Sequence, residues 1–256
     1  HAAAHAMTRA WAWTPPLLAL GLLPWLYAGD NNAALFLNLN HAFRAIPPDI
    51  WSALTMLGNT VVALSVTLLL FRHRRRLAYA TLIASLPATA LSQTLKILAD
   101  QPRPYRVMGD QVEVIGPTLL SHAFPSGHTT TLFVLASVLI VGARAREWAP
   151  VILLVAGLGA LSRIATGAHW PADLLGGIAC GWLSGLFGLT LAQRYLASPR
   201  PWLDRAIEAL LLGCAGYLLL FYNSGYPLAR PFEQILALAV LMAYWLPLLN
   251  VRKELT

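Results

Sequence analysis

The chain has 256 residues, of which 57% are hydrophobic and only 11% are charged, whereas an ordinary soluble domain carries about 25% charged residues. Its formal net charge of +7 would suggest a nucleic-acid partner in a soluble protein, but here arginines beside apolar segments account for most of it, as in membrane proteins. Together with a mean hydropathy of +0.60, these values argue against a soluble enzyme or a nucleic-acid-binding protein and predict an integral membrane protein.

Eight apolar segments are long enough to cross a bilayer as helices, since one crossing takes about 20 residues. No soluble domain, low-complexity tract or clear internal repeat separates them. We therefore expect an all-α fold, a polytopic transmembrane helical bundle with eight spans. The predicted spans lie near residues 11–28, 51–71, 77–99, 126–143, 149–166, 171–193, 205–223 and 232–250.

The beginning of the chain and its cysteines have ordinary interpretations. Residues 1–6, His-Ala-Ala-Ala-His-Ala, precede Met7 and are interpreted as a cloning remnant. No small-residue cleavage site stands out after the first apolar segment, so we interpret it as a retained span and not as a signal peptide. Cys180 and Cys214 both lie within apolar segments, and we expect packing thiols there, with neither a disulfide nor a zinc site.

Lysine and arginine placement orients the predicted spans, because cytoplasmic loops carry the excess of these residues. With the N-terminus in the cytoplasm, the inner side holds 12 of the 18 Lys and Arg residues and the outer side holds six. The run Arg72-His-Arg-Arg-Arg76 then marks a cytoplasmic turn between two spans. This assignment places the candidate site residues at the outer, non-cytoplasmic ends of their helices.

Two connecting segments and one glycine pattern bear on how the spans are arranged. Residues 31–48 mix apolar side chains with asparagines, which is typical of a short helix lying on the bilayer surface. Residues 100–123 form the longest hydrophilic segment, next to the candidate site. Gly177, Gly181 and Gly185 repeat every four residues in the sixth span, a small-residue pattern that lets helices approach closely.

Two cations follow one another at the end of the third predicted span. Lys96 ends an apolar run, where an unpaired cation is costly unless it reaches the interface or a partner. Arg103 stands between Pro102 and Pro104, which fix the backbone and stop the helix. At this spacing the two cations can close on one dianion, with arginine binding through two N–H groups and lysine acting as a point charge.

The sequence Pro125-Ser-Gly-His128 opens the fourth predicted span. Serine is a favoured N-cap residue, so Ser126 alone would indicate only a helix start. A helix N-terminus also offers free N–H groups and a positive dipole end to an anion, and Gly127 permits close approach of the backbone. His128 then lies in the first turn and points toward whatever those groups hold.

A third group of residues surrounds the start of the sixth predicted span. Arg163 ends the fifth span, and His169 and Asp173 bracket Pro171. Residues four apart share a helix face, so Asp173 can accept the Nδ1–H of His169 and leave Nε2 unprotonated. This is the arrangement of an oriented histidine nucleophile. No metal-ligand cluster accompanies these residues, and we expect no cofactor.

Together these residues resemble the three signature motifs of the type 2 phosphatidic acid phosphatases, a family of membrane-integral lipid phosphate phosphatases related in their site to vanadium haloperoxidases and bacterial acid phosphatases. All three motifs are complete, in order and at the family's spacing. The resemblance implies a six-span phosphatase core in residues 7–197, with residues 198–256 adding two C-terminal transmembrane helices after the Pro199-Arg-Pro201 break. The motifs are Lys96-x6-Arg103-Pro104, Pro125-Ser-Gly-His128 and Ser162-Arg163-x5-His169-x3-Asp173.

The resemblance also implies a role for each site residue. His169 attacks phosphorus to give a phosphohistidine, and Asp173 orients it. His128 protonates the leaving lipid oxygen, and water activated by His128 then releases phosphate. The residues expected to bind the phosphate oxygens are Lys96, Arg103, Ser126, Gly127 and Arg163.

We therefore expect a lipid phosphatase of the bacterial inner (cytoplasmic) membrane, with a lipid phosphate as substrate, membrane lipids around it and no nucleic-acid partner. From the substrates usual in the family and from the outward-facing site, we rank undecaprenyl pyrophosphate first, phosphatidylglycerophosphate or phosphatidic acid second, and lipid A phosphate third. A phosphotransferase that passes phosphate to another lipid shares every motif. A lipid transporter or binding module on the same scaffold is the alternative outside enzymes, and the His169–Asp173 pair argues against it because binding needs no nucleophile.

Overall fold

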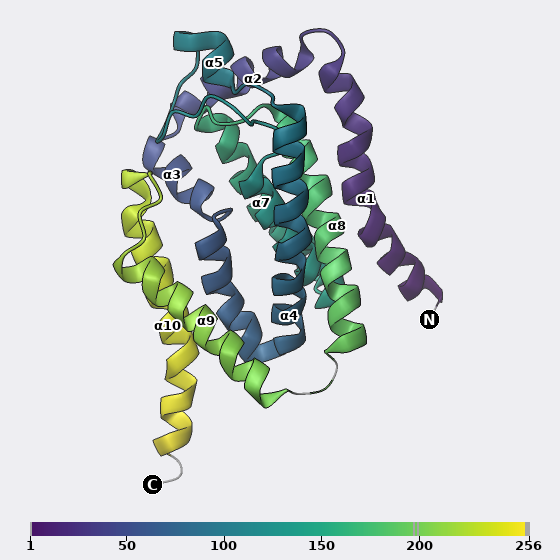
Figure 1. Cartoon of the computed structure of the whole chain (residues 1–256), viewed down its shortest axis with the longest axis vertical. Helices are drawn as coiled ribbons and strands as arrows, with labels where there is room; N and C mark the ends of the chain where they lie inside the picture. The colour runs from purple at the N-terminus through teal and green to yellow at the C-terminus, as the bar shows by residue number, and fades with distance from the viewer. Residues whose placement is uncertain (1, 197, 199, 254–256) are drawn as a thin grey trace.

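The computed structural model describes the chain except residues 1, 197, 199 and 254–256, and that part consists of helices joined by turns and loops. The predicted all-α class is confirmed. Long helices run side by side, with α1 on one flank and α9 and α10 on the other (Figure 1). The α-helices are α1 (Ala2–Tyr27), α2 (Asn31–Ala42), α3 (Pro48–Met56), α4 (Thr60–Ala99), α5 (Pro104–Met108), α6 (Gly127–Ser137), α7 (Ala149–Ala165), α8 (Pro171–Tyr195), α9 (Pro201–Leu220) and α10 (Arg230–Lys253). Shorter helical segments are η1 (Phe43–Ala45), η2 (Gly109–Gln111), η3 (Val138–Gly142), η4 (Arg146–Trp148) and η5 (Pro227–Ala229).

The second predicted span differs most from the structure. Residues 51–71 do not form one helix, because α3 ends before Gly58 and α4 begins after Asn59. The side-chain oxygen of Asn59 caps α4 by accepting a backbone N–H of its first turn at 2.9 Å. A Cβ at Gly58 would lie 2.7 Å from the carbonyl oxygen of His128. The break therefore brings the start of α4 against the start of α6.

Helix α4 turns back on itself at Arg74, which has the non-helical dihedrals φ −149° and ψ 68°. Figure 1 shows the chain running down to this turn and up again, so that the two halves of α4 correspond to parts of the second and third predicted spans. We call this turn, together with the start of α9, the opposite end of the bundle. The site end is where α4 ends and α6 and α8 begin.

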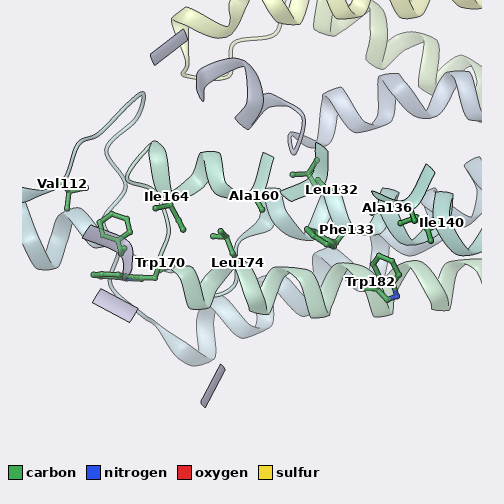
Figure 2. Packing of buried hydrophobic residues seen from close by; sticks show 14 residues of the cluster. Val112, Leu132, Phe133, Ala136, Ile140, Ala160, Ile164, Trp170, Leu174 and Trp182 are labelled. Atoms are coloured by element: carbon green, nitrogen blue, oxygen red, sulfur yellow. The ribbon is translucent and has the colours of Figure 1, made fainter. Parts of the chain in front are cut away.

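Close packing of α6 against α8 builds the site end. A Cβ at Gly177 would lie 2.8 Å from the carbonyl oxygen of Ser126, which is the close approach that the four-residue glycine pattern predicts. The N–H of Ser126 donates to the carbonyl oxygen of Asp173 at 2.9 Å and joins the first turns of the two helices. Deeper in the same interface lie Phe133 and Trp182, with ring centroids 6.5 Å apart (Figure 2).

The segment predicted as a surface helix, residues 31–48, begins with α2, which crosses the site end (Figure 1). Asn32 accepts the N–H of Ala172 at 3.0 Å, so a side chain of α2 satisfies an unpaired donor in the first turn of α8. The amide of Asn40 donates to the carbonyl oxygen of Ile164 at 2.9 Å. Helix α2 thus fixes the end of α7 and the start of α8.

The C-terminal helices α9 and α10 pack against α3 and the first half of α4. One shared apolar cluster includes Met56 and Leu218, and another includes Leu68 and Leu211. At the opposite end, Arg75 of α4 forms an ion pair with Asp204 of α9 at 2.9 Å. Helices α9 and α10 are therefore joined to the rest of the bundle along much of their length.

By length and composition, two helical stretches of the described residues could cross a membrane, namely Thr60–Gln111 and Pro171–Tyr195. The helices Gly127–Gly142 and Ala149–Ala165 are also apolar but shorter. Each predicted span falls mainly on helical residues, whereas the count of eight crossings stays a prediction.

Candidate active site

The eight residues singled out in the sequence come from four different helix ends and the loops beside them, and all of these lie at the site end. Lys96 is in the last turn of α4, and Arg163 is in the last turn of α7. The other six residues lie in the loop before α5, at the start of α6, in the loop before α8 and in its first turn. They are Arg103, Ser126, Gly127, His128, His169 and Asp173.

His169 and Asp173 form the buried pair that their spacing predicts. Nδ1 of His169 lies 3.1 Å from Oδ2 of Asp173, and the same oxygen accepts the N–H of Trp170 at 2.8 Å. On its other side, Nε2 of His169 lies 3.2 Å from Nη1 of Arg103. Because a guanidinium can only donate, Nε2 is the acceptor in this contact, and the ring carries its proton on Nδ1. The lone pair on Nε2, which here accepts from Arg103, is the one that a histidine nucleophile uses.

The electrostatic surroundings favour the neutral form of this imidazole. Burial, together with the nearby charges of Arg103 and Arg163, holds the pKa of His169 well below its usual value. Burial and the neighbouring charge of Arg163 lower the pKa of Arg103 to about 10, so its guanidinium is still protonated at neutral pH. The site therefore combines an uncharged imidazole with charged cations.

Backbone carbonyl groups hold Lys96 and Arg103 in place. Arg103 donates from Nε to the carbonyl oxygen of Ser121 and from Nη1 to that of Ala168, each at 2.8 Å. Lys96 donates to the carbonyl oxygen of Pro125 at 2.9 Å. Neutral acceptors orient a cation without cancelling its charge, so both cations remain available to an anion.

The start of α6 has the expected N-cap. The hydroxyl oxygen of Ser126 accepts the N–H of Thr129 at 3.3 Å and the hydroxyl of the same threonine at 3.0 Å. Both bonds use Ser126 as an acceptor, which leaves its own hydroxyl hydrogen for a ligand. A Cβ at Gly127 would meet nothing closer than the Ser92 hydroxyl at 4.0 Å, so space is open beside this turn.

His128 lies next to that space. It lines a cleft of about 240 Å³ that is enclosed by α6 and by the two halves of α4. Its Nε2 is buried and has no hydrogen-bond partner in the part of the chain that the structure describes. The hydroxyl of Ser92, on the same cleft, is likewise buried without a partner there. His128 makes no hydrogen bond to His169 among the described residues, so the two imidazoles are independent groups of one site.

Arg163 is 2% exposed and is held by two hydroxyl groups that lie outside the sequence motifs. Its Nη1 donates to Thr55 of α3 at 2.5 Å and to Tyr226, in the loop before η5, at 2.9 Å. Its carbonyl oxygen accepts the N–H of His169 at 3.1 Å, which connects the third cation to the histidine loop. Thr55 and Tyr226 are separated from Arg163 by 108 and 63 residues, so no motif spacing could reveal them.

The site's charge pattern limits its chemistry. Three cations surround a carboxylate-oriented imidazole, and among the described residues no carboxylate forms an ion pair with any of these cations. Within the same residues, no group of three or more His, Cys, Asp and Glu side chains could hold a metal ion. The charges and the oriented imidazole of such a site suit the binding and attack of a phosphoryl group, the chemistry of phosphoryl-transferring proteins.

A protein-family model matches the part of the chain that contains the candidate site. The model of the PAP2 superfamily matches residues 74–197, a stretch that contains all eight candidate site residues. Residues 74–197 are thus a PAP2 superfamily domain, which confirms the family resemblance of the motifs.

Relatives and solved structures agree with this assignment. The undecaprenyl-diphosphatase of Sulfolobus acidocaldarius is 27% identical over 177 residues, which cover 66% of this chain and 84% of the relative. The crystal structure of Aquifex aeolicus LpxE is similar with a TM-score of 0.59 and 29% identity, covering 64% of this chain and 97% of LpxE. A transmembrane PAP2 type phosphatidylglycerolphosphate phosphatase from Bacillus subtilis shares the fold, with a TM-score of 0.53 and 18% identity over 73% of this chain and 98% of that one.

Proposed function

We propose that this protein is an integral membrane phosphatase that hydrolyses a lipid pyrophosphate, with undecaprenyl pyrophosphate as its first-ranked substrate. The observation that carries the proposal is the set of cations around His169, which have no carboxylate partner in the part of the chain that the structure describes. Isolated buried charges are costly, so their arrangement is explained if a phosphate group is their counterion. The relative named as an undecaprenyl-diphosphatase, matched over 84% of its length, supports the choice of a diphosphate.

In the proposed first step, the Nε2 lone pair of His169 attacks the terminal phosphorus. The bond between that phosphorus and the bridging oxygen breaks, and His128, protonated at that stage, gives its proton to the leaving lipid phosphate. Asp173 stabilises the imidazolium that forms on His169 and keeps the ring aligned. The product of this step is a phosphohistidine together with a lipid monophosphate.

In the second step, water attacks the phosphohistidine. His128 accepts a proton from the water as its oxygen bonds to phosphorus, and the bond from phosphorus to Nε2 of His169 breaks. Inorganic phosphate leaves, and both histidines return to their starting states. General acid–base catalysis of this kind contributes about 10²–10⁴-fold to the rate.

Through both steps, Lys96, Arg103 and Arg163 neutralise charge on the phosphoryl oxygens. The hydroxyl hydrogen of Ser126 and the backbone N–H of Gly127 are proposed as further donors to those oxygens. Positive charges placed in this way act on a transition state whose charge is spread over three equatorial oxygens, so no cofactor enters the proposal.

We further propose that residues 7–197 are a six-span catalytic core in the bacterial inner membrane, that residues 198–256 add two spans, and that the site faces the periplasm. The excess of cationic residues at the opposite end supports this orientation. Cysteine labelling tests it in a background without Cys180 and Cys214. Asp110→Cys, on the exposed loop at the site end, should react with an impermeant maleimide in cells stripped of any outer membrane, and His73→Cys should not. The reverse labelling pattern would contradict the orientation.

Phosphate release from purified protein in detergent tests the activity. Undecaprenyl pyrophosphate should release phosphate faster than phosphatidylglycerophosphate, phosphatidic acid or lipid A at equal surface concentration, and the variant His169→Ala should release none above background. If one of the other lipids releases phosphate faster, that lipid becomes the preferred substrate in place of undecaprenyl pyrophosphate. Transfer of labelled phosphate to an added lipid, without release, would identify a phosphotransferase, and binding without either reaction would identify a lipid-binding module or transporter.

A further inference from the structure

The contact between Arg163 and Tyr226 joins the PAP2 domain to a part of the chain outside it. Arg163 belongs to the matched stretch, residues 74–197, whereas Thr55 precedes that stretch and Tyr226 follows it. All three residues are buried. A cation that belongs to the family's motif is therefore held by two residues that the family match does not include.

The geometry of these contacts leaves one edge of the guanidinium available. Nη1 of an arginine carries two hydrogens, and here they are directed at the hydroxyl oxygens of Thr55 and Tyr226, at 2.5 and 2.9 Å. Nε of Arg163 is buried and has no hydrogen-bond partner among the residues that the structure describes. Because the guanidinium is planar, the two hydrogen bonds from Nη1 fix the orientation of its plane. They therefore also fix the direction of the unpaired Nε–H.

Tyr226 is itself rigidly placed. Its ring packs in the apolar cluster with Met56 and Leu218, and the centroid of the ring lies 5.9 Å from Cζ of Arg163. Gly116, at φ +85°, passes so close beneath the ring that a Cβ there would overlap it. The position of the hydroxyl is therefore set by the C-terminal helix pair on one side and by the loop before α6 on the other.

We propose that Tyr226, assisted by Thr55, is a positioning residue for Arg163, so that the C-terminal helices α9 and α10 complete the active site of the PAP2 domain. This inference rests on the proposed function of Arg163 as a phosphate-binding cation. The hydroxyl groups orient the Nε–H toward the phosphoryl group, and an arginine that is misaligned by rotation of its fork loses part of its transition-state stabilisation.

The variant Tyr226→Phe isolates the hydroxyl, because phenylalanine keeps the ring that packs on Gly116 and Met56. We expect kcat on the lipid substrate to fall about tenfold, since a hydrogen bond to a charged group is worth roughly that factor, with a smaller change in KM. Tyr222→Phe is the matched control. Tyr222 lies in the same loop, but its hydroxyl accepts from Asn59 at 2.6 Å and does not contact Arg163, so kcat should stay at the wild-type value.

A second pair of variants separates positioning from packing. Thr55→Val removes the other hydroxyl at nearly constant shape and should lower kcat in the same way, whereas Thr55→Ser should restore it. In an Arg163→Lys background, Tyr226→Phe should have little further effect, because the flexible ammonium has no fork to align. Wild-type kcat in Tyr226→Phe, or an equal loss with and without Arg163, would overturn the inference.

Failure of the proposed function is distinguishable from failure of this inference. If the wild-type protein releases no phosphate from any lipid tested, the function fails and the inference is examined with orthovanadate, whose binding to the full chain is measured by tryptophan fluorescence. Tyr226→Phe should then weaken vanadate binding while Tyr222→Phe does not. Equal vanadate affinity in the two variants and the wild type would overturn the positioning role independently of catalysis.

Discussion

The arginines of the candidate site and two arginines at the opposite end of the bundle have different kinds of partner. At the opposite end, Arg75 forms an ion pair with Asp204, and Arg72 stacks over the ring of Tyr244 at 5.5 Å. At the site end, Arg103 and Arg163 contact carbonyl oxygens, hydroxyl groups and an imidazole. Among the described residues, neither Arg103 nor Arg163 has a carboxylate partner.

The paired arginine is more exposed than the two arginines of the site, which is the reverse of what the stability of the fold alone would favour. The side chain of Arg75 is 45% exposed although it has a counterion, whereas Arg103 and Arg163 are 8% and 2% exposed and have no counterion among the described residues. A buried charge costs several kcal/mol unless it is neutralised, so the site end carries a cost that the opposite end avoids. The difference supports the proposal that the site binds an anion from outside the chain, whereas the pairs at the opposite end stabilise the fold.

The largest expected effect concerns the group that the site-end cations surround. His169→Ala should reduce kcat by about 10⁴-fold or more, as removal of a covalent nucleophile does in other enzymes. Thermal unfolding in detergent checks that the variant is folded. Activity within tenfold of wild type in folded His169→Ala protein would show that His169 is not the nucleophile. The two ends of the bundle could then not be distinguished by a catalytic role of the site end.

A matched pair of arginine variants tests the comparison directly. Arg103→Gln should lower kcat/KM by about 10²–10³-fold, the loss typical of one charge-stabilising donor, while the unfolding temperature should stay the same or rise because an unpaired buried charge is removed. Arg75→Gln should leave kcat/KM at the wild-type value. Equal losses of activity in the two variants would show that the ends do not differ in function.

Local rules explain which site residues could be predicted from sequence. The His169–Asp173 pair follows from a four-residue helical spacing, and the Ser126 cap follows from serine before an apolar run. The approach of α6 to α8 follows from the glycine pattern around Gly177. In each case the chemistry and its partner lie within a few residues or one helical face, so the pattern is visible in the chain.

Other features depend on contacts that no local pattern encodes. Thr55 and Tyr226 meet Arg163 only because α3 and the C-terminal pair pack beside α7, across 108 and 63 residues of sequence. The predicted span 51–71 is not one continuous helix for a related reason. Its mean hydropathy hides the Gly58–Asn59 break, which is stabilised by the contact of Gly58 with the backbone of His128.

A smaller effect is expected from removing the counterion at the opposite end. Asp204 accepts hydrogen bonds from Arg75 and from the hydroxyl of Tyr79, so Asp204→Asn weakens both. A loss of about 1 kcal/mol corresponds to a decrease of about 2–4 °C in unfolding temperature, with unchanged kcat. A decrease in kcat at constant unfolding temperature would contradict the structural role assigned to this end.

The last prediction is that a chelator has no effect on activity. It tests whether the cations of the site are sufficient to neutralise the charge of the phosphoryl group. Lys96, Arg103 and Arg163 already place three positive charges around the position proposed for the phosphoryl group, and a divalent cation among them would meet their repulsion in a site of low dielectric. Excess EDTA should therefore leave the initial rate of phosphate release unchanged, while orthovanadate should inhibit because it resembles the pentacoordinate phosphoryl group. The control is Arg103→Gln, whose residual rate should also be insensitive to EDTA. Loss of wild-type activity on chelation, with recovery on adding Mg²⁺, would show that these cations do not balance the phosphate charge, and their lack of carboxylate partners would then need another explanation.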